Sequence, residues 1–106
     1  MPRQYIRKKP SANVAHQERY NCMVAFLEML REAGAGNEVH ADLYFNKIVA
    51  KGIDPRVALP ACPSLFRSFA ASGAIELVKG KAFISARHGR NVIRVWKVTN
   101  KPLPNV

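Results

Sequence analysis

Acidic residues are scarce in this sequence of 106 residues, which contains 7 Asp and Glu against 17 Lys and Arg. The deficit is greatest in the second half, where residues 54–106 hold nine basic residues and two acids, against eight and five in residues 1–53. No acid follows Glu76, although seven basic residues do. Because a surface of one charge sign attracts polyanions, we expect a nucleic acid as the partner, with simple solubility as the alternative explanation.

Cysteines are also few, and their positions favour neither a metal site nor a redox site. Cys22 lies in an apolar helical run and Cys62 lies between two prolines, without CxxC spacing. We therefore expect two reduced thiols, no disulfide, and a cytoplasmic, nucleoid-associated protein. No apolar run reaches about 18 residues, and the N-terminal segment has no apolar stretch typical of a secretory signal, so we expect neither a membrane span nor export.

Combinations of catalytic residues are missing too. The sequence shows no grouping of a nucleophile, a base and an orienting acid, and its histidines lie far apart without Cys or carboxylate partners at ligand spacing. Glu28 and Glu32 have the i, i+4 spacing that is typical of a solvated helix face. We therefore expect no enzymatic activity, no metal, no cofactor and no small-molecule ligand.

Apolar residues make up 48% of the sequence, which is enough to form a core. We expect one folded domain at residues 15–99, preceded by a flexible basic arm at residues 1–14 and followed by a tail at residues 100–106. Hydrophobic periodicity predicts a first helix from about His16 to the Gly34–Gly36 segment. Its apolar face comprises Tyr20, Met23, Val24, Leu27 and Leu30.

A second helix is predicted over about residues 41–51, with its stop at Gly52. A structured turn follows over residues 52–62, in which Asp54 and Pro55 begin a single helical turn that Pro60 breaks. The residues of the second helix that are expected to face the core are Phe45, Ile48 and Val49.

A third helix is predicted to open at Pro63 and to end at Gly73. One of its faces is apolar, and the other carries one guanidinium, two hydroxyls and one methyl group. Such a composition would permit close approach to DNA, and it is equally typical of a helix face that contacts only solvent. The apolar face comprises Leu65, Phe66, Phe69 and Ala70, and the opposite face comprises Ser64, Arg67, Ser68 and Ala71.

Strand-forming residues follow Gly73 and predict strands at residues 74–78, 82–87 and 92–99. A turn at residues 79–81 would join the first two strands, and a tip at residues 88–91 would join the last two. Phe83 and Trp96 are expected to be core residues, because they lie in regular strands. Helices followed by strands predict an α+β fold.

The order of helix, short extended segment, helix, turn, helix and two-stranded hairpin resembles the winged helix-turn-helix domain from about residue 16 to residue 99. The stretch FAASGAIELVKGKAF carries much of this resemblance, since in that family the recognition helix ends in small residues and passes into the first wing strand. The resemblance implies a three-helix core with a C-terminal β-hairpin wing. One departure is the expected turn before the third helix, which contains Pro60 and Pro63 and is longer than in the family.

The resemblance also implies that the third helix enters the major groove of DNA while the hairpin follows the phosphate backbone. Unpaired cations at a hairpin tip become favourable when each meets a phosphate and releases a counterion. Arg94 lies between Val92 and Trp96 on one strand face, so it either stacks on the indole or points toward phosphate. The arm cations either follow a groove or only add solubility. The candidate DNA-binding residues are Ser64, Arg67 and Ser68 on the third helix, Lys79, Lys81, Arg87, His88, Arg90, Asn91 and Arg94 on the strands and hairpin, and Arg7, Lys8 and Lys9 in the arm.

Taken together, these features predict a double-stranded DNA-binding protein, either a small transcriptional regulator or an architectural accessory factor of bacterial or phage type. We expect it to act as a homodimer that uses the apolar stripe of the first helix, because one reading helix gives little specificity alone. The alternative is a winged-helix protein interaction module that docks on a polymerase, a ribosome or a host factor.

Replacing Arg87 and Arg90 together by alanine is expected to weaken duplex DNA binding without an appreciable change in melting temperature, because both residues are predicted at an exposed tip. Titration of labelled DNA and a thermal melt of the same variant provide the two measurements. Unchanged binding together with a large loss of stability would contradict the assignment of these residues to the wing.

Overall fold

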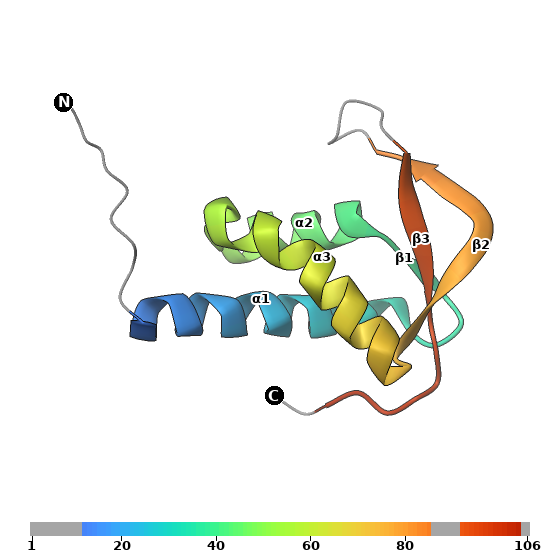
Figure 1. Cartoon of the computed structure of the whole chain (residues 1–106), viewed down its shortest axis with the longest axis horizontal. Helices are drawn as coiled ribbons and strands as arrows, with labels where there is room; N and C mark the ends of the chain where they lie inside the picture. Colours follow the sequence, from blue (N-terminus) through green and yellow to red (C-terminus); the bar gives the residue numbers. More distant parts are fainter. Residues whose placement is uncertain (1–11, 86–91, 105–106) are drawn as a thin grey trace.

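Three helices and a three-stranded antiparallel sheet form the part of the chain that the computed structural model describes, residues 12–85 and 92–104 (Figure 1). This confirms the predicted α+β class with a winged-helix-like arrangement. In chain order, the elements are α1 (Ala12–Ala33), β1 (Glu38–Val39), α2 (Ala41–Lys51), α3 (Pro55–Ser72), β2 (Ile75–Ile84) and β3 (Val92–Val98).

The sheet has the order β1-β3-β2, so the central strand is the last one in the chain. The short extended segment after α1 pairs with β3 at Val39 and Trp96, and the Gly36 N–H donates to the Val98 carbonyl oxygen at 2.7 Å. Strands β2 and β3 form the wing hairpin. The N-terminal part of the chain is thereby attached to the wing through main-chain hydrogen bonds.

The predicted turn at residues 79–81 is wrong, because these residues lie inside the single long strand β2. The pairing register with β3 is Leu77 to Trp96 on one side of them and Ala82 to Arg94 on the other, so residues 78–81 form a bulge. Gly80 has a φ of 76°, which bends the strand without reversing it. The sequence Lys-Gly-Lys is typical both of a turn and of a bulge, so it does not indicate which of the two forms.

The predicted break at Pro60 is also wrong, since α3 runs without interruption from Pro55 to Ser72. Asp54 caps its start by accepting a hydrogen bond from the Arg56 N–H at 2.9 Å, and Pro55 occupies the first turn, where no intrahelical donor is needed. Pro60 and Pro63 are exposed. Each interior proline costs about 3 kcal/mol, and the burial of apolar residues along the opposite side of the helix offsets this cost. Those residues are Ala58, Cys62, Phe66 and Phe69.

The connection between α2 and α3 is therefore only the three residues Gly52–Asp54, and the longer turn expected before the third helix is absent from this part of the chain. Gly52 ends α2 in the left-handed region with a φ of 68°, and its N–H donates to carbonyl oxygens of the last turn of α2. The connection before the third helix therefore does not depart from the winged helix-turn-helix pattern in the way that the sequence indicated.

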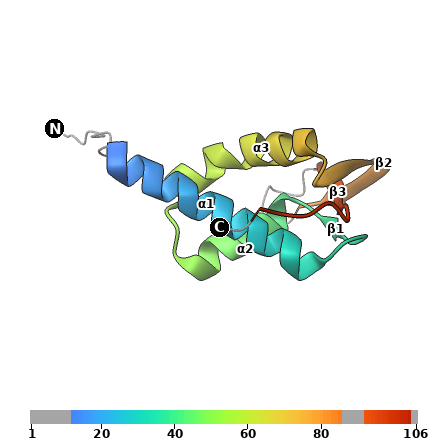
Figure 2. The ribbon, with the colours of Figure 1, turned by 90° about the horizontal axis from the view of Figure 1, so that it is seen from below.

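Phe26 of α1 lies at the centre of the core, fully buried. Its ring centroid lies 4.8 Å from that of Phe66, 4.9 Å from that of Phe69 and 5.9 Å from that of Tyr44, so residues of all three helices meet around it. The predicted apolar face of the third helix is confirmed for Phe66 and Phe69, with Leu65 and Ala70 partly buried against the same cluster. Figure 2 shows α2 and α3 on opposite sides of α1.

One of the three residues of α2 that were predicted to face the core is exposed. Phe45 and Ile48 are buried as expected, but Val49 is 65% exposed and Tyr44 takes its place in the core. The Tyr44 hydroxyl donates to the Ala58 carbonyl oxygen of α3 at 3.2 Å, which satisfies the polar end of a fully buried side chain. Its burial raises the pKa of Tyr44 well above its usual range.

Both ends of the domain extend beyond the predicted limits. Helix α1 begins at Ala12, inside the segment expected to be a flexible arm. At the other end, Leu103 packs against the core and Arg31 donates to the Pro104 carbonyl oxygen. The tail predicted at residues 100–106 is therefore packed against α1 for at least part of its described length.

The apolar stripe of α1, which we expected to contact a second copy, is used in part inside the chain. Of its predicted residues, Leu27 and Leu30 are fully buried in the common core and Met23 is partly buried against it, whereas Tyr20 is 43% exposed. Cys22 and Cys62 are both free and buried, and burial raises the pKa of the Cys62 thiol to about 11. A thiol in this environment stays protonated and unreactive at neutral pH.

Candidate nucleic-acid interface

The solvent-exposed face of α3 contains the three helix residues that the sequence predicts as DNA contacts. Ser64, Arg67 and Ser68 are all exposed. Because α3 begins at Pro55, the same face continues toward the helix start and includes Arg56, which lies eight and eleven residues before Ser64 and Arg67, respectively. The exposed face is therefore longer than predicted and basic at two positions.

Arg56 is the residue of this face that already has an acidic partner. Its guanidinium donates to both carboxylate oxygens of Asp54, with an Nη2 to Oδ2 distance of 2.9 Å. The hydrogen bonds from Arg56 hold the pKa of Asp54 below its usual range. Both groups are exposed to solvent, so the pair adds little to stability. Its effect is to reduce the positive charge available at the start of α3.

A groove of about 450 Å³ follows α3 on the side that faces α1. Arg19 of α1 and Arg56 of α3 contribute guanidinium groups to it, and two hydroxyls come from Ser64 and Ser68. The rest of the lining is apolar or small. The remaining lining residues are Val57, Pro60, Ala61 and Leu65.

The end of β2 and the residue after it contact β1 and the residues around the start of α2. Phe83 stacks on His40 with ring centroids 3.9 Å apart, and the buried Ser85 donates its hydroxyl to Asp42 Oδ1 at 2.7 Å. Lys81 Nζ donates to Glu38 Oε2 at 2.9 Å. These contacts fix the direction of β2 relative to the helices, and Lys81, a predicted DNA contact, is partly neutralised by Glu38.

Acidification is expected to weaken these contacts through His40. Burial lowers the pKa of His40, although the charges of Asp42 and Glu38 raise it in part. The unfolded chain therefore binds the proton more readily than the folded one, so stability is complete above the unfolded pKa and falls as the pH drops below about 6.5. Urea unfolding between about pH 7.5 and pH 5.5 measures this loss.

The same titration of a His40→Gln variant is the control, because glutamine does not ionise. We expect a flatter dependence of the unfolding free energy on pH for this variant. An equally steep dependence in both proteins would assign the titration to another group.

Phe83 and Trp96, both predicted to be core residues, have different environments. Trp96 is partly buried, and its ring lies 5.8 Å from that of Phe66 on α3. Phe83 is 38% exposed and contacts His40 instead of the core. Arg94 is exposed and lies opposite Ala82 in the wing. Since strand residues alternate between faces, Arg94 shares the sheet face of Trp96 and not that of Phe83.

Ion pairs divide the described cations into two groups. Five cations pair with carboxylates: Lys47 with Glu32, Lys51 with Glu28, Arg56 with Asp54, Lys81 with Glu38 and, at 3.9 Å, Lys97 with Glu76. Within residues 12–85 and 92–104, the cations outside such pairs are Arg19, Arg31, Arg67, Lys79, Arg94 and Lys101.

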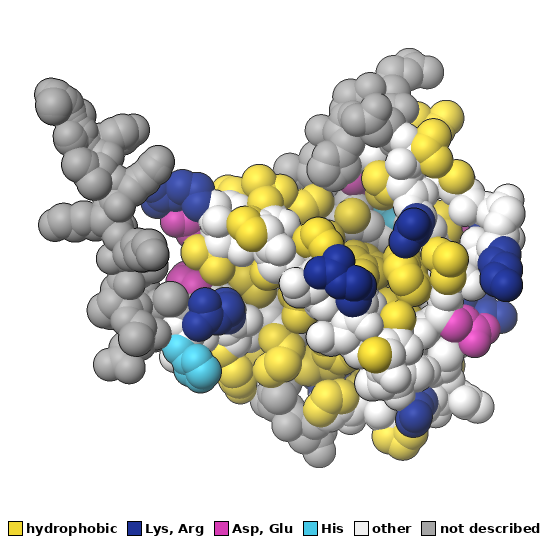
Figure 3. Space-filling view, in the orientation of Figure 1, with side chains coloured by type: hydrophobic (Ala, Val, Ile, Leu, Met, Phe, Trp, Pro, Cys, Tyr) yellow, Lys and Arg dark blue, Asp and Glu magenta, His cyan; other side chains and the backbone are white. Residues whose placement is uncertain are grey.

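The unpaired cations extend beyond the wing. They include Arg19 on α1 and Arg67 on α3, besides Lys79 and Arg94 on the strands. Figure 3 shows Lys and Arg side chains at separate places from the helices to the strands, and acidic side chains lie next to some of them at the left and right of the view. Among the described residues, the unpaired cations are therefore not confined to the hairpin.

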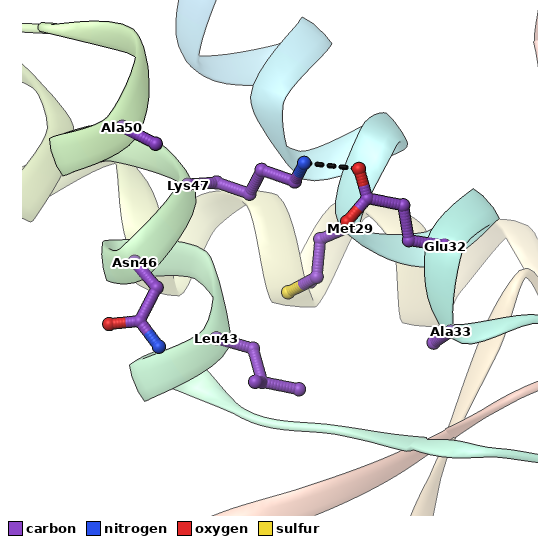
Figure 4. A pocket seen from close by; sticks show the side chains of 7 residues that line it. All are labelled: Met29, Glu32, Ala33, Leu43, Asn46, Lys47 and Ala50. Atoms are coloured by element: carbon purple, nitrogen blue, oxygen red, sulfur yellow. Dashed lines mark hydrogen bonds and ion pairs between the residues drawn. The ribbon is translucent and has the colours of Figure 1, made fainter.

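The second groove, between α1 and α2, differs in charge. It has a volume of about 400 Å³, and Met29 and Leu43 are among its lining residues. The Lys47 ammonium donates to Glu32 across it, as the dashed line in Figure 4 shows. Because Glu32 already neutralises Lys47, the rim of this groove offers no surplus positive charge to a polyanion. This groove is therefore not a candidate for the nucleic-acid interface.

Several predicted contacts lie outside the described residues. These are Arg7, Lys8 and Lys9 of the arm and Arg87, His88, Arg90 and Asn91 of the hairpin, and they stay predictions. Among the residues that are described, no group of three or more His, Cys, Asp or Glu side chains is arranged to hold a metal ion. In the same ranges, no helix is both long enough and apolar enough to cross a membrane.

Sequence reasoning missed Arg19 and Arg56 as candidate contacts. A signal for Arg56 was present, since Ala58, Cys62, Phe66 and Phe69 continue the helical spacing of apolar residues across both prolines. Arg19 had no such signal, because its place beside α3 depends on how the helices pack. Comparison with known proteins adds no further assignment: no family model, curated protein or solved structure matches this chain.

Proposed function

We propose that this chain is a double-stranded DNA-binding protein that uses the exposed face of α3 together with the β2–β3 wing. The observation that carries the proposal is the charge of this surface: Arg67 on α3 and Lys79 and Arg94 on the wing have no ion pair among the described residues. The acids at the start of α3 and in the sheet, Asp54, Glu38 and Glu76, are each paired with another cation. A regulatory or architectural role in transcription fits a domain of this size.

Two kinds of contact would act together in this interface. Cations on the wing and helices neutralise phosphates and release counterions, which supplies most of the affinity. Arg67 is the only guanidinium among the predicted contacts on the exposed face of α3, flanked by the small residues Ser64 and Ser68, which permit close approach. A bidentate contact from Arg67 to a guanine would contribute about 1 to 3 kcal/mol of discrimination.

A second candidate function is docking on a protein, and the outer part of the wing favours it. Ile84 and Val92, which are opposite each other in the register, are 60% and 66% exposed, and Leu77, at the other end of β2, is 42% exposed. Exposed apolar side chains gathered on one hairpin are typical of protein contact surfaces. A protein partner of this surface would bind with little dependence on salt.

Measuring the affinity for a mixed-sequence DNA duplex at several salt concentrations tests the proposal. We expect the logarithm of the association constant to fall linearly with the logarithm of salt concentration between about 50 and 200 mM, with a slope of about −0.9 for each phosphate contacted. A dissociation constant weaker than about 10⁻⁴ M at physiological salt would contradict DNA binding and leave protein docking as the better hypothesis.

A further inference from the structure

We infer that the groove between α1 and α3 binds one sugar-phosphate strand of the DNA, with Arg19 as its principal phosphate contact. This inference rests on the proposed function and deepens it, because it assigns a backbone site beside the exposed face of α3. Neither Arg19 nor any other residue of α1 was predicted to contact DNA from the sequence.

The groove is continuous with the exposed face of α3. Ser64 and Ser68 line the groove and also belong to the exposed face of α3 that is proposed to enter the major groove. A duplex placed against that face brings one of its backbones beside the helix, and on the side toward α1 this backbone meets the groove. The same two hydroxyls are then available to bases or phosphates.

The chemistry of the lining matches a nucleic-acid backbone. Such a backbone combines anionic phosphates with sugars that have apolar faces, and the lining of this groove combines hydrogen-bond donors with apolar side chains. Guanidinium and hydroxyl groups provide donors for phosphate oxygens. Val57, Pro60 and Ala61 provide small apolar contacts without a charge. No carboxylate is among the residues that line the groove.

The two guanidinium groups of the groove are not equivalent. Arg19 is exposed and makes no ion pair with any described residue. Arg56 is held by Asp54, whose carboxylate accepts from it at 3.2 Å and 2.9 Å. A phosphate at Arg56 would have to compete with that carboxylate, whereas a phosphate at Arg19 would not. Arg19 should therefore contribute more to binding, and Asp54 should oppose it.

This asymmetry gives two variants with opposite expected effects on the binding of the mixed-sequence duplex. Arg19→Ala should reduce the affinity, and the salt slope should shrink by about 0.9, the contribution of one phosphate contact. Asp54→Asn should increase the affinity, because it frees Arg56 and removes a negative charge. Asparagine caps a helix about as well as aspartate, so α3 should keep its start.

Arg31→Ala is the matched control, since it removes the same charge from the same helix. Arg31 is twelve residues from Arg19, which places it about 18 Å farther along α1, and it does not line the groove. The affinity and slope of this variant should stay near those of the unmodified protein. Thermal melts of all three variants show whether each one is folded.

The outcomes separate this inference from the proposed function. Duplex binding by the unmodified protein that Arg19→Ala does not weaken, or that Arg31→Ala weakens equally, would overturn the groove assignment and leave DNA binding by α3 and the wing in place. Failure of the unmodified protein to bind the duplex would overturn both. If polyglutamate then bound in an Arg19-dependent manner, the groove would be a site for an acidic protein segment.

Discussion

Replacing Phe26 by alanine is expected to lower the free energy of unfolding by about 3 to 5 kcal/mol, the largest effect that a single substitution in this core should have. Phe26 is fully buried, and its ring contacts those of Phe66, Phe69 and Tyr44 from the other two helices. Truncation removes the shared contact and leaves a cavity at the centre of the domain. Urea or thermal unfolding, followed by circular dichroism, measures the loss.

The matched control is Val49→Ala. Val49 also lies in a helix and is apolar, but it is 65% exposed, so its truncation should change stability by no more than about 0.5 kcal/mol. If Phe26→Ala melted close to the unmodified protein, the three helices would not meet at this ring, and the arrangement of α3 relative to α1 would be wrong.

Removing Arg67, Lys79 and Arg94 together is expected to have the largest effect on DNA binding. Each cation that meets a phosphate contributes about 0.9 to the salt slope, so the slope should fall by nearly three and the affinity at about 0.1 M salt by about 10² to 10³-fold. The three side chains are exposed and have no ion pairs with described residues, so the melting temperature should change little.

A second triple variant controls for net charge. Alanine at Arg31, Lys47 and Lys51 also removes three positive charges, but these residues lie on α1 and α2, outside the proposed surface, and the two lysines pair with Glu32 and Glu28. Surface pairs of this kind contribute about 0 to 1 kcal/mol each, so this protein should remain folded. Equal losses of affinity in the two triple variants would mean that DNA responds to total charge and not to the proposed surface.

The helices were largely predictable from the sequence because their periodicity is a local property. The bounds of α2 and the two faces of the second half of α3 follow directly from the spacing of apolar residues. Proline was the main source of error. Its local cost predicted a break at Pro60, whereas the burial of Ala58 and Cys62 on the opposite side keeps the helix continuous.

Features that depend on packing could not be predicted in the same way. Tyr44 is buried because the Ala58 carbonyl oxygen on another helix accepts its hydroxyl, and Glu38 pairs with Lys81, which is 43 residues away. In the candidate site, too, some residues follow from local periodicity and others depend on packing. Ser64, Arg67 and Ser68 were found from helical spacing, whereas Arg19 joins them only through the contact of α1 with α3.

The bulge in β2 has a consequence for self-association. With the order β1-β3-β2, β2 lies at an edge of the sheet, and an unprotected edge strand can pair with a strand of another molecule and start aggregation. The irregular backbone at Gly80, between two lysines, interrupts the straight row of main-chain donors and acceptors that such pairing needs. The other edge strand, β1, has only 2 residues. Copies of this chain that associate would therefore do so more readily through side-chain surfaces than by joining their sheets into one.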